Sequence, residues 1–224
     1  MKNIVLINGS PRAEGSASMK MLNQLKSRFD SDCNITVIEA AKSILHKRQP
    51  EDYVGMERAD AIVLIFPLYV YCLPGALTEF LVGYSEYLSG AGKPSGQKIY
   101  AVINCGFPES RINNDAAHVV KRFCDEIHAA YRFSVLIGSG GMLQPMKLLP
   151  PINAAWKRIG SAFDKIAGDI TGTEEPQDIH IESKVPEKLF FFIAQTNFAF
   201  LAKRNGVKGK QLYKQPYLPG KTAD

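Results

Sequence analysis

The chain has 224 residues, 46% of them hydrophobic, and 27 basic and 22 acidic side chains give it a formal net charge of +5. This composition is ordinary for a soluble globular protein with a sizeable core, and basic and aromatic residues are not interleaved as in nucleic-acid-binding motifs. Four widely spaced cysteines without a C-x-x-C motif argue against a metal centre or a disulfide scaffold. We therefore expect a cytoplasmic protein that holds no metal and binds neither membrane nor nucleic acid.

Residues 1–18 predict a strand, a polar loop and the start of a helix. The apolar run 3–8 is typical of a buried parallel strand, and residues 19–29 place apolar side chains on one helical face. Such a loop directs backbone N–H groups and the positive end of the helix dipole at a ligand above it. Three serines and Arg12 add donors that suit a phosphate. We expect an anion site here.

Two better-known phosphate loops do not match this stretch. A P-loop requires a lysine where Ser16 follows Gly15, and the dinucleotide fingerprint requires a second glycine where Pro11 stands. The alternative to an anion site is an ordinary loop whose serines cap the helix.

Further along the chain, strands alternate with helices. The segment 40–59 is polar and poorly patterned, which predicts a loop with at most a short helix, and 171–186 is a linker by composition. Apolar runs predict strands at 34–39, 60–66, 97–104 and 133–137, and amphipathic patterns predict helices at 75–88, 112–131 and 152–170.

This alternation predicts an α/β fold, a doubly wound parallel sheet of five strands with helices on both faces. In such sheets ligands bind at the carboxyl ends of the strands. The loops at that edge are 9–18, 67–74, 104–111 and 138–142. We expect the functional site to lie among them.

Three motifs in these loops carry a resemblance. Gly9-Ser10-Pro11-Arg12 precedes Ser16 and Ser18, Pro67-Leu68-Tyr69 is followed by Pro74, and Asn104-Cys105-Gly106 follows the fourth strand. Over about residues 1–140, this order resembles the NAD(P)H-dependent FMN reductase family of flavodoxin-like proteins. The resemblance implies strand order 2-1-3-4-5, with FMN at the switch point between the first and third strands.

The resemblance also implies which residues bind FMN. The phosphate would be held, partly through backbone amides, by Ser10, Arg12, Ser16, Ala17 and Ser18. The loop under the isoalloxazine would be Pro67, Leu68, Tyr69, Val70 and Tyr71. The loop at the other edge of the ring would be Asn104, Cys105, Gly106 and Phe107. A dianion at a helix N-terminus and a planar ring on aromatic surface agree with this physically.

The implied activity is hydride transfer from NAD(P)H to FMN, followed by electron transfer to a small acceptor such as a flavin or a quinone. The flavin carries this chemistry, so we name no catalytic residue. Tyr69 and Tyr71 are candidates for the walls of the substrate pocket, and ordinary aromatic packing is the alternative for both.

Two other functions remain open from the sequence. Cys105 and Arg111 have the C-x5-R spacing of cysteine-dependent phosphatases, although Pro108 and Glu109 suit a phosphate cradle poorly. The other alternative is a flavodoxin-type electron carrier that binds FMN without nicotinamide turnover.

We divide the chain into an FMN-binding domain over 1–170 and a linker with a C-terminal helical extension over 171–224. Residues 189–201 predict a strongly apolar helix that ends near Asn205-Gly206. This helix would pack on its own domain or on the second subunit of a homodimer, where it would roof the flavin.

Overall fold

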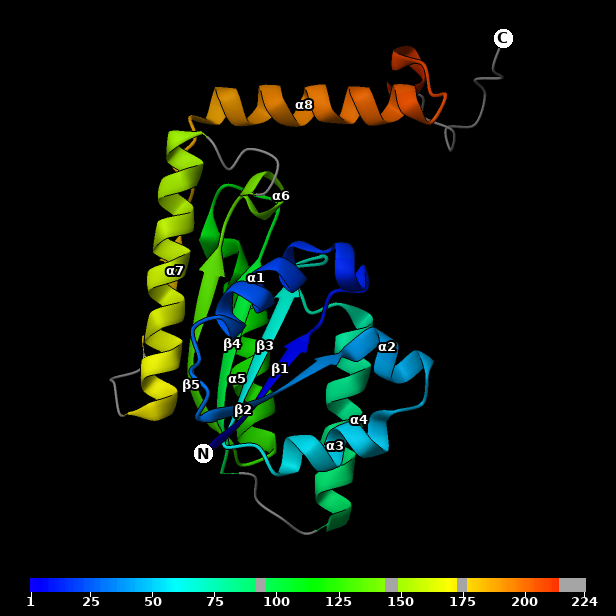
Figure 1. Cartoon of the computed structure of the whole chain (residues 1–224). Coiled ribbons are helices and arrows are strands. Elements are labelled where there is room, and N and C mark those ends of the chain that lie inside the picture. Colours follow the sequence, from blue (N-terminus) through cyan, green and yellow to red (C-terminus); the bar gives the residue numbers. More distant parts are fainter. Residues whose placement is uncertain (92–95, 144–148, 173–176, 214–224) are drawn as a thin grey trace. The chain divides into compact units, whose positions relative to one another are not determined.

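A parallel sheet with strand order β2-β1-β3-β4-β5-β6 lies at the centre of the computed structural model, which describes residues 1–91, 96–143, 149–172 and 177–213 (Figure 1). The strands are β1 (Lys2–Asn8), β2 (Cys33–Glu39), β3 (Ala61–Pro67), β4 (Lys98–Asn104), β5 (Ala130–Ile137) and β6 (Ile179–Ile181). All neighbouring strands pair in parallel. The α/β class and the order 2-1-3-4-5 predicted from the sequence and the resemblance are therefore confirmed.

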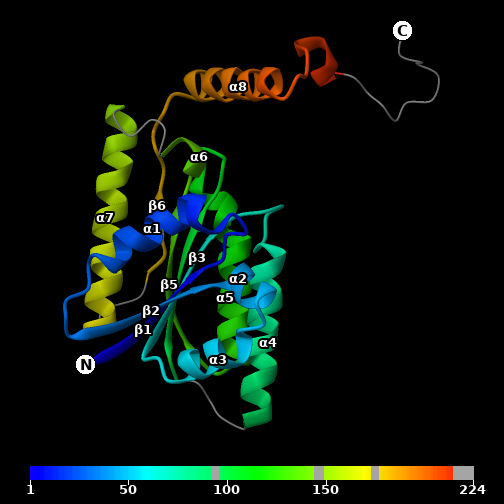
Figure 2. The same ribbon diagram turned by 45° about the vertical axis from the view of Figure 1, so that its right-hand side comes forward.

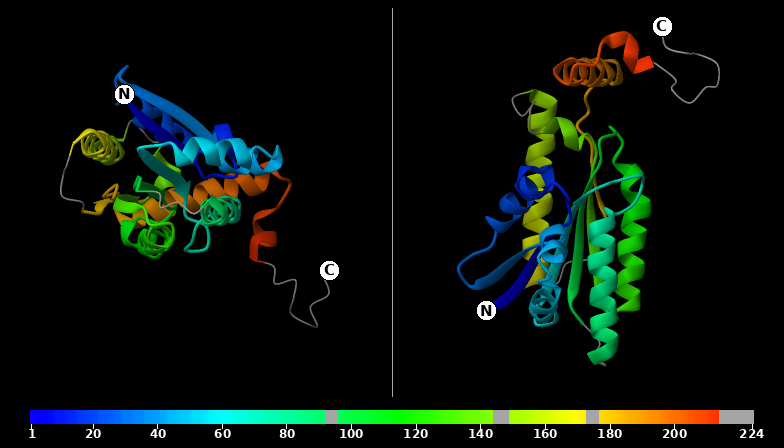
Figure 3. Two further views of the ribbon diagram at one scale, coloured as in Figure 1. Left: turned by 90° about the horizontal axis from the view of Figure 1, so that it is seen from below. Right: turned by 90° about the vertical axis from the view of Figure 1, so that its right-hand side faces the viewer.

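Helices cover both faces of the sheet (Figure 3). One face carries α1 (Ala17–Lys26) and α7 (Pro150–Thr171), which contact each other. The other carries α2 (Ala40–Leu45), α3 (Gln49–Glu57), α4 (Gly75–Ala91) and α5 (Asn114–Glu126). The short elements α6 (Gly140–Leu143), η1 (Ala13–Gly15) and η2 (Ser110–Asn113) lie in the loops. Both faces of the central strands are buried, which explains their nearly continuous apolar sequences.

Two predictions about the connections are wrong. The segment 40–59 forms two helices, α2 and α3, because buried Tyr53 and Met56 pack into the core formed with α4. The predicted linker 171–186 contains β6, which pairs with β5 and adds a sixth strand to the expected five. A three-residue edge strand has too few apolar positions to stand out in a polar segment.

The chain forms two compact units, Met1–Lys184 and Val185–Asp224. The second unit holds α8 (Glu187–Arg204) and η3 (Gly209–Tyr213), and α8 ends at Asn205 with Gly206 in the left-handed region. The predicted apolar helix and its C-cap are thus confirmed. Within the described residues, no helix combines the length and the apolar character that a membrane span requires.

Candidate functional site

Four loops follow the carboxyl ends of β1, β3, β4 and β5 and meet at one edge of the sheet (Figures 1 and 2). All strands point the same way, so these loops come together although they are far apart in the sequence. The residues that we predicted for the FMN site lie in the first three loops and at the start of α1, except Pro67 and Asn104, which are the last residues of β3 and β4.

The loop after β1 is shaped by its own polar groups. The Asn8 side chain is buried, its Oδ1 accepts a hydrogen bond from Ser10 N (3.1 Å), and its Nδ2 donates to Ala13 O (3.3 Å). Gly9 packs so closely that a Cβ there would lie 2.6 Å from Leu77 Cδ2 and 2.9 Å from Phe66 Cβ. Only glycine fits this position without a shift of its neighbours. The loop therefore lies directly on the end of the sheet.

The serine side chains of this loop bond within the protein. Ser16 caps α1, since its Oγ accepts from Met19 N (3.0 Å) and donates to Ala13 O (2.7 Å). Ser10 Oγ accepts from Arg12 N (3.3 Å), and Ser18 Oγ accepts from Asn104 Nδ2 (3.2 Å). All three serines are buried, which leaves little side-chain surface for a ligand. Their hydroxyls position the loop and the helix start.

The hydrogen-bond donors that stay open at the start of α1 are backbone N–H groups and an arginine side chain, not the serine hydroxyls. In the described part of the chain, the backbone N–H groups of Ala17 and Ser18, the first two of α1, have no acceptor. Arg12 is exposed and forms no ion pair with a described residue. Two aligned N–H groups, the positive end of a helix dipole and an exposed guanidinium are groups that can bind a dianion.

The loop after β3 is a tight turn with an unusual backbone. Tyr69 N donates to Cys72 O (2.9 Å) and Cys72 N donates to Tyr69 O (3.0 Å), which closes a two-residue turn. Its central residues, Val70 and Tyr71, have φ of 49° and 61°. Positive φ at both positions is typical of type I′ turns, which favour Asn and Gly there.

The left-handed conformation of Val70 and Tyr71 costs free energy. A Cβ in the left-handed region costs roughly 1–2 kcal/mol per residue, and a β-branched residue such as valine is a clear outlier there. Both side chains project from the turn, with Val70 93% and Tyr71 56% exposed. Strain of this kind is common at functional sites.

The loop after β4 is joined to the other two. Leu68 N donates to Asn104 O (2.8 Å), and Asn104 Nδ2 reaches both Ser18 Oγ and Phe66 O (3.1 Å). Asn104 thus links β4, the end of β3 and the start of α1. A Cβ on Gly106 would meet no protein atom within 4 Å, so the backbone there is open to close approach.

The loop after β5 supports the loop after β4. Ser139 N donates to Phe107 O (2.6 Å), and Gly140 N donates to Cys105 O (2.7 Å). A Cβ on Gly138 would lie 2.1 Å from Pro108 O, and one on Gly140 would lie 2.7 Å from Asn104 Oδ1. These glycines allow the two loops to pack backbone against backbone.

Cys105 is buried beneath its loop. Its Sγ lies 3.5 Å from Phe107 O and 3.7 Å from Glu109 O, and Asn113 Nδ2 lies 3.5 Å from it. Burial raises the pKa of the Cys105 thiol, whereas a nucleophilic cysteine needs a lowered one. This environment disfavours the thiolate that the alternative of a cysteine-dependent phosphatase requires.

The structure brings predicted residues of all three loops together through the pairs Ser18–Asn104, Leu68–Asn104 and Tyr71–Phe107. Sequence reasoning missed the supporting residues Asn8, Asn113 and Gly138. An asparagine that ends a strand before a turn signals such a role for Asn8. The other two depend on contacts between loops, which no local pattern reveals.

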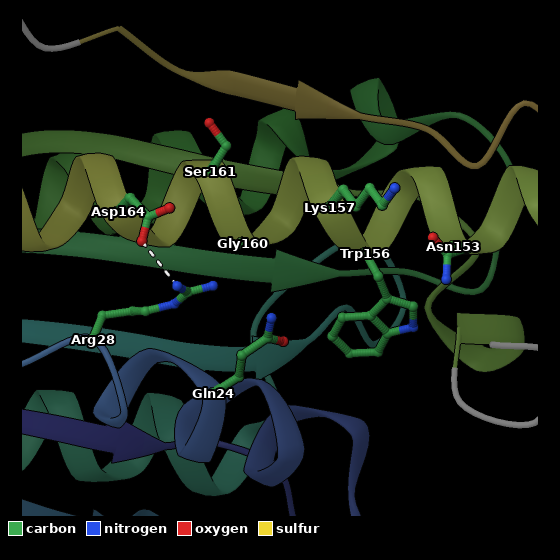
Figure 4. Close-up of a pocket in the computed structure, with 8 residues that line it drawn as sticks. All are labelled: Gln24, Arg28, Asn153, Trp156, Lys157, Gly160, Ser161 and Asp164. Atoms are coloured by element: carbon green, nitrogen blue, oxygen red, sulfur yellow. Dashed lines mark ion pairs between the residues drawn. The ribbon is translucent and has the colours of Figure 1, made fainter.

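A separate pocket of about 460 Å³ lies between α1 and α7 (Figure 4). Arg28, in the turn after α1, pairs with Asp164 of α7 (3.2 Å) at one end, and Trp156 lies toward the other. None of the predicted FMN-site residues lines it. A second hollow, of about 390 Å³, lies between α4 and α5 and is lined mainly by apolar side chains such as Leu81, Val82 and Phe123.

The family model of NADPH-dependent FMN reductases matches residues 2–136, which include β1 to β4 and nearly all of β5. The chain belongs to this family. It is accordingly an oxidoreductase that uses FMN and NAD(P)H. A comparison with curated protein sequences finds no match.

Solved structures share the fold at low sequence identity. An NADH:FMN oxidoreductase, solved in its apo form, superposes with a TM-score of 0.59 and 16% identity, covering 84% of this chain and 99% of its own. An azoreductase from Bacillus anthracis strain Sterne superposes with a TM-score of 0.55 and 17% identity, covering 74% of this chain and 100% of its own. An NAD(P)H:quinone oxidoreductase from Methanothermobacter marburgensis superposes with a TM-score of 0.57 and 12% identity, covering 79% and 99%.

Proposed function

We propose that this reductase binds FMN at the carboxyl edge of the sheet and passes the electrons of NAD(P)H to a small organic acceptor, such as a flavin, a quinone or an azo compound. The observation that carries the proposal is the start of α1, where the Ala17 and Ser18 N–H groups and Arg12 are open to an anion. The acceptors named in two of the similar structures, azo compounds and quinones, support this choice of substrate class.

The residues present fit FMN. Its phosphate would take the Ala17 and Ser18 N–H groups and Arg12, while the hydroxyls of Ser10, Ser16 and Ser18 keep the loop in shape. The three groups that face the anion lie within one helical turn and its preceding loop. A dianion is stabilised there by the helix dipole and by charge-assisted hydrogen bonds.

The loops after β3 and β4 would take the isoalloxazine. Pro67, Leu68 and Tyr69 supply apolar and aromatic surface, and the open backbone at Gly106 admits a flat ring at its edge. Val70, Asn104 and Cys105 complete the two loops around the ring, whereas Tyr71 and Phe107, also predicted for the FMN site, keep about half of their surface exposed and would lie outside the contact with FMN. Backbone N–H groups of these two loops would stabilise negative charge on the reduced isoalloxazine ring.

FMN, once bound, supplies the hydride and electron chemistry. The protein's part is to hold the nicotinamide and the acceptor in turn, and no side chain of this site needs to transfer a proton in the hydride step. We therefore propose no catalytic residue, as the sequence suggested.

The test is an anaerobic titration of the FMN-loaded protein with NADPH and then with NADH. We expect the absorbance near ~450 nm to fall with one or both donors and to recover when a quinone is added. Failure to take up added FMN would contradict the proposal. Bound FMN that stays oxidised with both donors would favour the alternative of an electron carrier.

We also propose that the protein is a cytoplasmic homodimer. In support, α8 exposes Phe192, Phe198 and Phe200, and large apolar side chains that gather on a surface are typical of a face that another protein surface covers. The four cysteines are free thiols, as in reducing compartments. Sedimentation equilibrium tests the dimer, and a monomer mass at micromolar concentration would contradict it.

A further inference from the structure

Two aromatic side chains from different loops stand side by side at the outer rim of the site. The rings of Tyr71, after β3, and Phe107, after β4, have centroids 6.4 Å apart and planes inclined by only 17°. Their exposed fractions are 56% and 50%, so both rings keep about half of their surface in water. Aromatic rings usually bury their faces, and a half-exposed parallel pair offers apolar surface to a ligand.

The ring geometry suits a flat ligand. Non-bonded carbon atoms pack at about 3.5 Å, so one planar ring inserted between two others needs about 7 Å. The centroids are only 6.4 Å apart, so the nearly parallel pair leaves no room for a ring between its members and instead offers the exposed ring surface as a flat shelf. A planar conjugated molecule gains face contact with this shelf, whereas a compact hydrophilic ion gains none.

The backbone beneath both rings is held in place. The reciprocal hydrogen bonds of Tyr69 and Cys72 close the turn that carries Tyr71, and its left-handed backbone directs the side chain outward. Phe107 O accepts the 2.6 Å hydrogen bond from Ser139 N, which ties its loop to the end of β5. Positioning both rings before a ligand arrives lowers the entropy lost on binding.

The degree of exposure distinguishes an exchanging ligand from a resident one. A cofactor that stays bound through many turnovers is held by enclosed surface and by charged or polar contacts, as at the start of α1. Tyr71 and Phe107 instead lie at loop tips. Among the described residues, the Tyr71 hydroxyl forms no hydrogen bond that would hold the two rings together. A molecule that must enter and leave in each cycle fits this position.

We propose that Tyr71 and Phe107 form the acceptor subsite and that they select planar conjugated acceptors, such as quinones, over compact ones, such as ferricyanide. This inference rests on the proposed function. In the overall reaction a quinone gains two electrons and one proton as the hydride of NAD(P)H and a second proton from water. It leaves as the hydroquinone, and NAD(P)⁺ is released.

The test compares the two half-reactions of FMN-loaded Tyr71→Leu, Phe107→Leu and the double variant by stopped-flow. With a naphthoquinone, we expect the apparent second-order rate constant for flavin reoxidation to fall about tenfold in each single variant, because stacking surface is lost. With ferricyanide, the same rate constant for flavin reoxidation should change less than twofold. Tyr71→Phe keeps the ring and should restore the behaviour of the unmodified protein, which separates the aromatic face from the hydroxyl.

Two results would overturn the proposal. Equal losses with both acceptors would show that the variants disturb the site as a whole. A raised Kd for FMN would show that the rings hold the cofactor instead. Reoxidation is started from protein reduced with dithionite, so the acceptor test still runs if NAD(P)H fails to reduce the flavin, an outcome that would count against the proposed function alone.

Discussion

The two ends of the sheet differ in how their polar groups are hydrogen-bonded. Near the amino ends of β4 and β5, the fully buried carboxylate of Asp169 accepts hydrogen bonds from Tyr100 OH (2.7 Å) and from Arg132 Nε and Nη2 (both 2.8 Å). At the carboxyl ends, backbone N–H groups at the start of α1 are open, aromatic rings are exposed, and two residues have positive φ. One end surrounds a buried carboxylate with internal donors, and the other leaves backbone N–H groups and aromatic surface available.

The difference shows which residues serve stability and which serve binding. Burial, together with the hydrogen bond to Asp169, raises the pKa of Tyr100, and the hydrogen bond to Asp169 raises the pKa of Arg132. Tyr100 therefore stays neutral and Arg132 stays charged across the usual pH range. At the carboxyl edge, the strain at Val70 and Tyr71 lowers stability and is retained by the surrounding structure, as is common where a site must be held ready.

The largest effect is expected from Asp169→Asn, at the end of the sheet built for stability. The substitution removes a fully buried charge that accepts hydrogen bonds from Arg132 and Tyr100, so the free energy of unfolding should fall by about 3 kcal/mol. The matched control is Asp164→Asn, whose ion pair with Arg28 is largely exposed and should contribute under about 1 kcal/mol. Urea unfolding measures both, and equal losses would contradict the contrast. The Kd for FMN should not change in either variant.

Arg12→Ala should show the opposite pattern. Arg12 is exposed and has no ion pair in the described part of the chain, so stability should stay within about 0.5 kcal/mol. The Kd for FMN should rise about tenfold, since a charge-assisted contact with a phosphate is lost. Arg122→Ala, in another exposed arginine, is the control. Fluorescence titration of FMN measures the effect, and an unchanged Kd would remove Arg12 from the phosphate site.

The buried core predicts a loss of stability in alkaline solution. Burial raises the pKa of Cys124 to about 12 from 9.0, and the pKa of Tyr53 and Tyr84 to about 12 from 10.0. At a pH between the unfolded and the folded pKa of such a group, the unfolded chain releases a proton that the folded chain keeps. The free energy of unfolding is therefore highest below about pH 9 and falls as the pH rises toward 12. Each group contributes at most about 1.4 kcal/mol per pH unit.

Cys124→Ala isolates one of these groups. The variant should lose a constant amount of stability from the smaller side chain, but its stability should fall less steeply above about pH 9. Urea unfolding at a series of pH values measures the slope. An identical slope in both proteins would show that Cys124 does not contribute to the alkaline loss.

The smallest effect is expected from Val70→Asn, at the strained turn. Asparagine tolerates the left-handed region better than valine, so the free energy of unfolding should rise by about 1 kcal/mol. Val119→Asn replaces another exposed valine, which lies in α5, and should give no gain. A thermal scan detects the difference, and a loss of stability in Val70→Asn would show that the turn is not strained in solution.

Much of the fold was predictable because its signals are local. Apolar runs in β1, β3, β4 and β5 and a Gly/Ser loop before α1 are short-range patterns, and they predicted the α/β class, while the strand order was implied by the resemblance. The failures at α2, α3 and β6 share one cause. They are short elements within largely polar segments, and contacts with α4 and β5 decide their structure.

The candidate site divides in the same way. The sequence by itself determined that a serine- and arginine-bearing loop precedes α1 and that aromatic residues follow β3, because both are properties of a single stretch of chain. Only the tertiary structure decided that the serine hydroxyls turn inward, that Cys105 is buried, and that Tyr71 lies beside Phe107. These features depend on which groups from distant loops meet at the edge of the sheet. Burial, pKa and ring geometry depend on how these loops pack together, so the identity of each residue alone does not determine them.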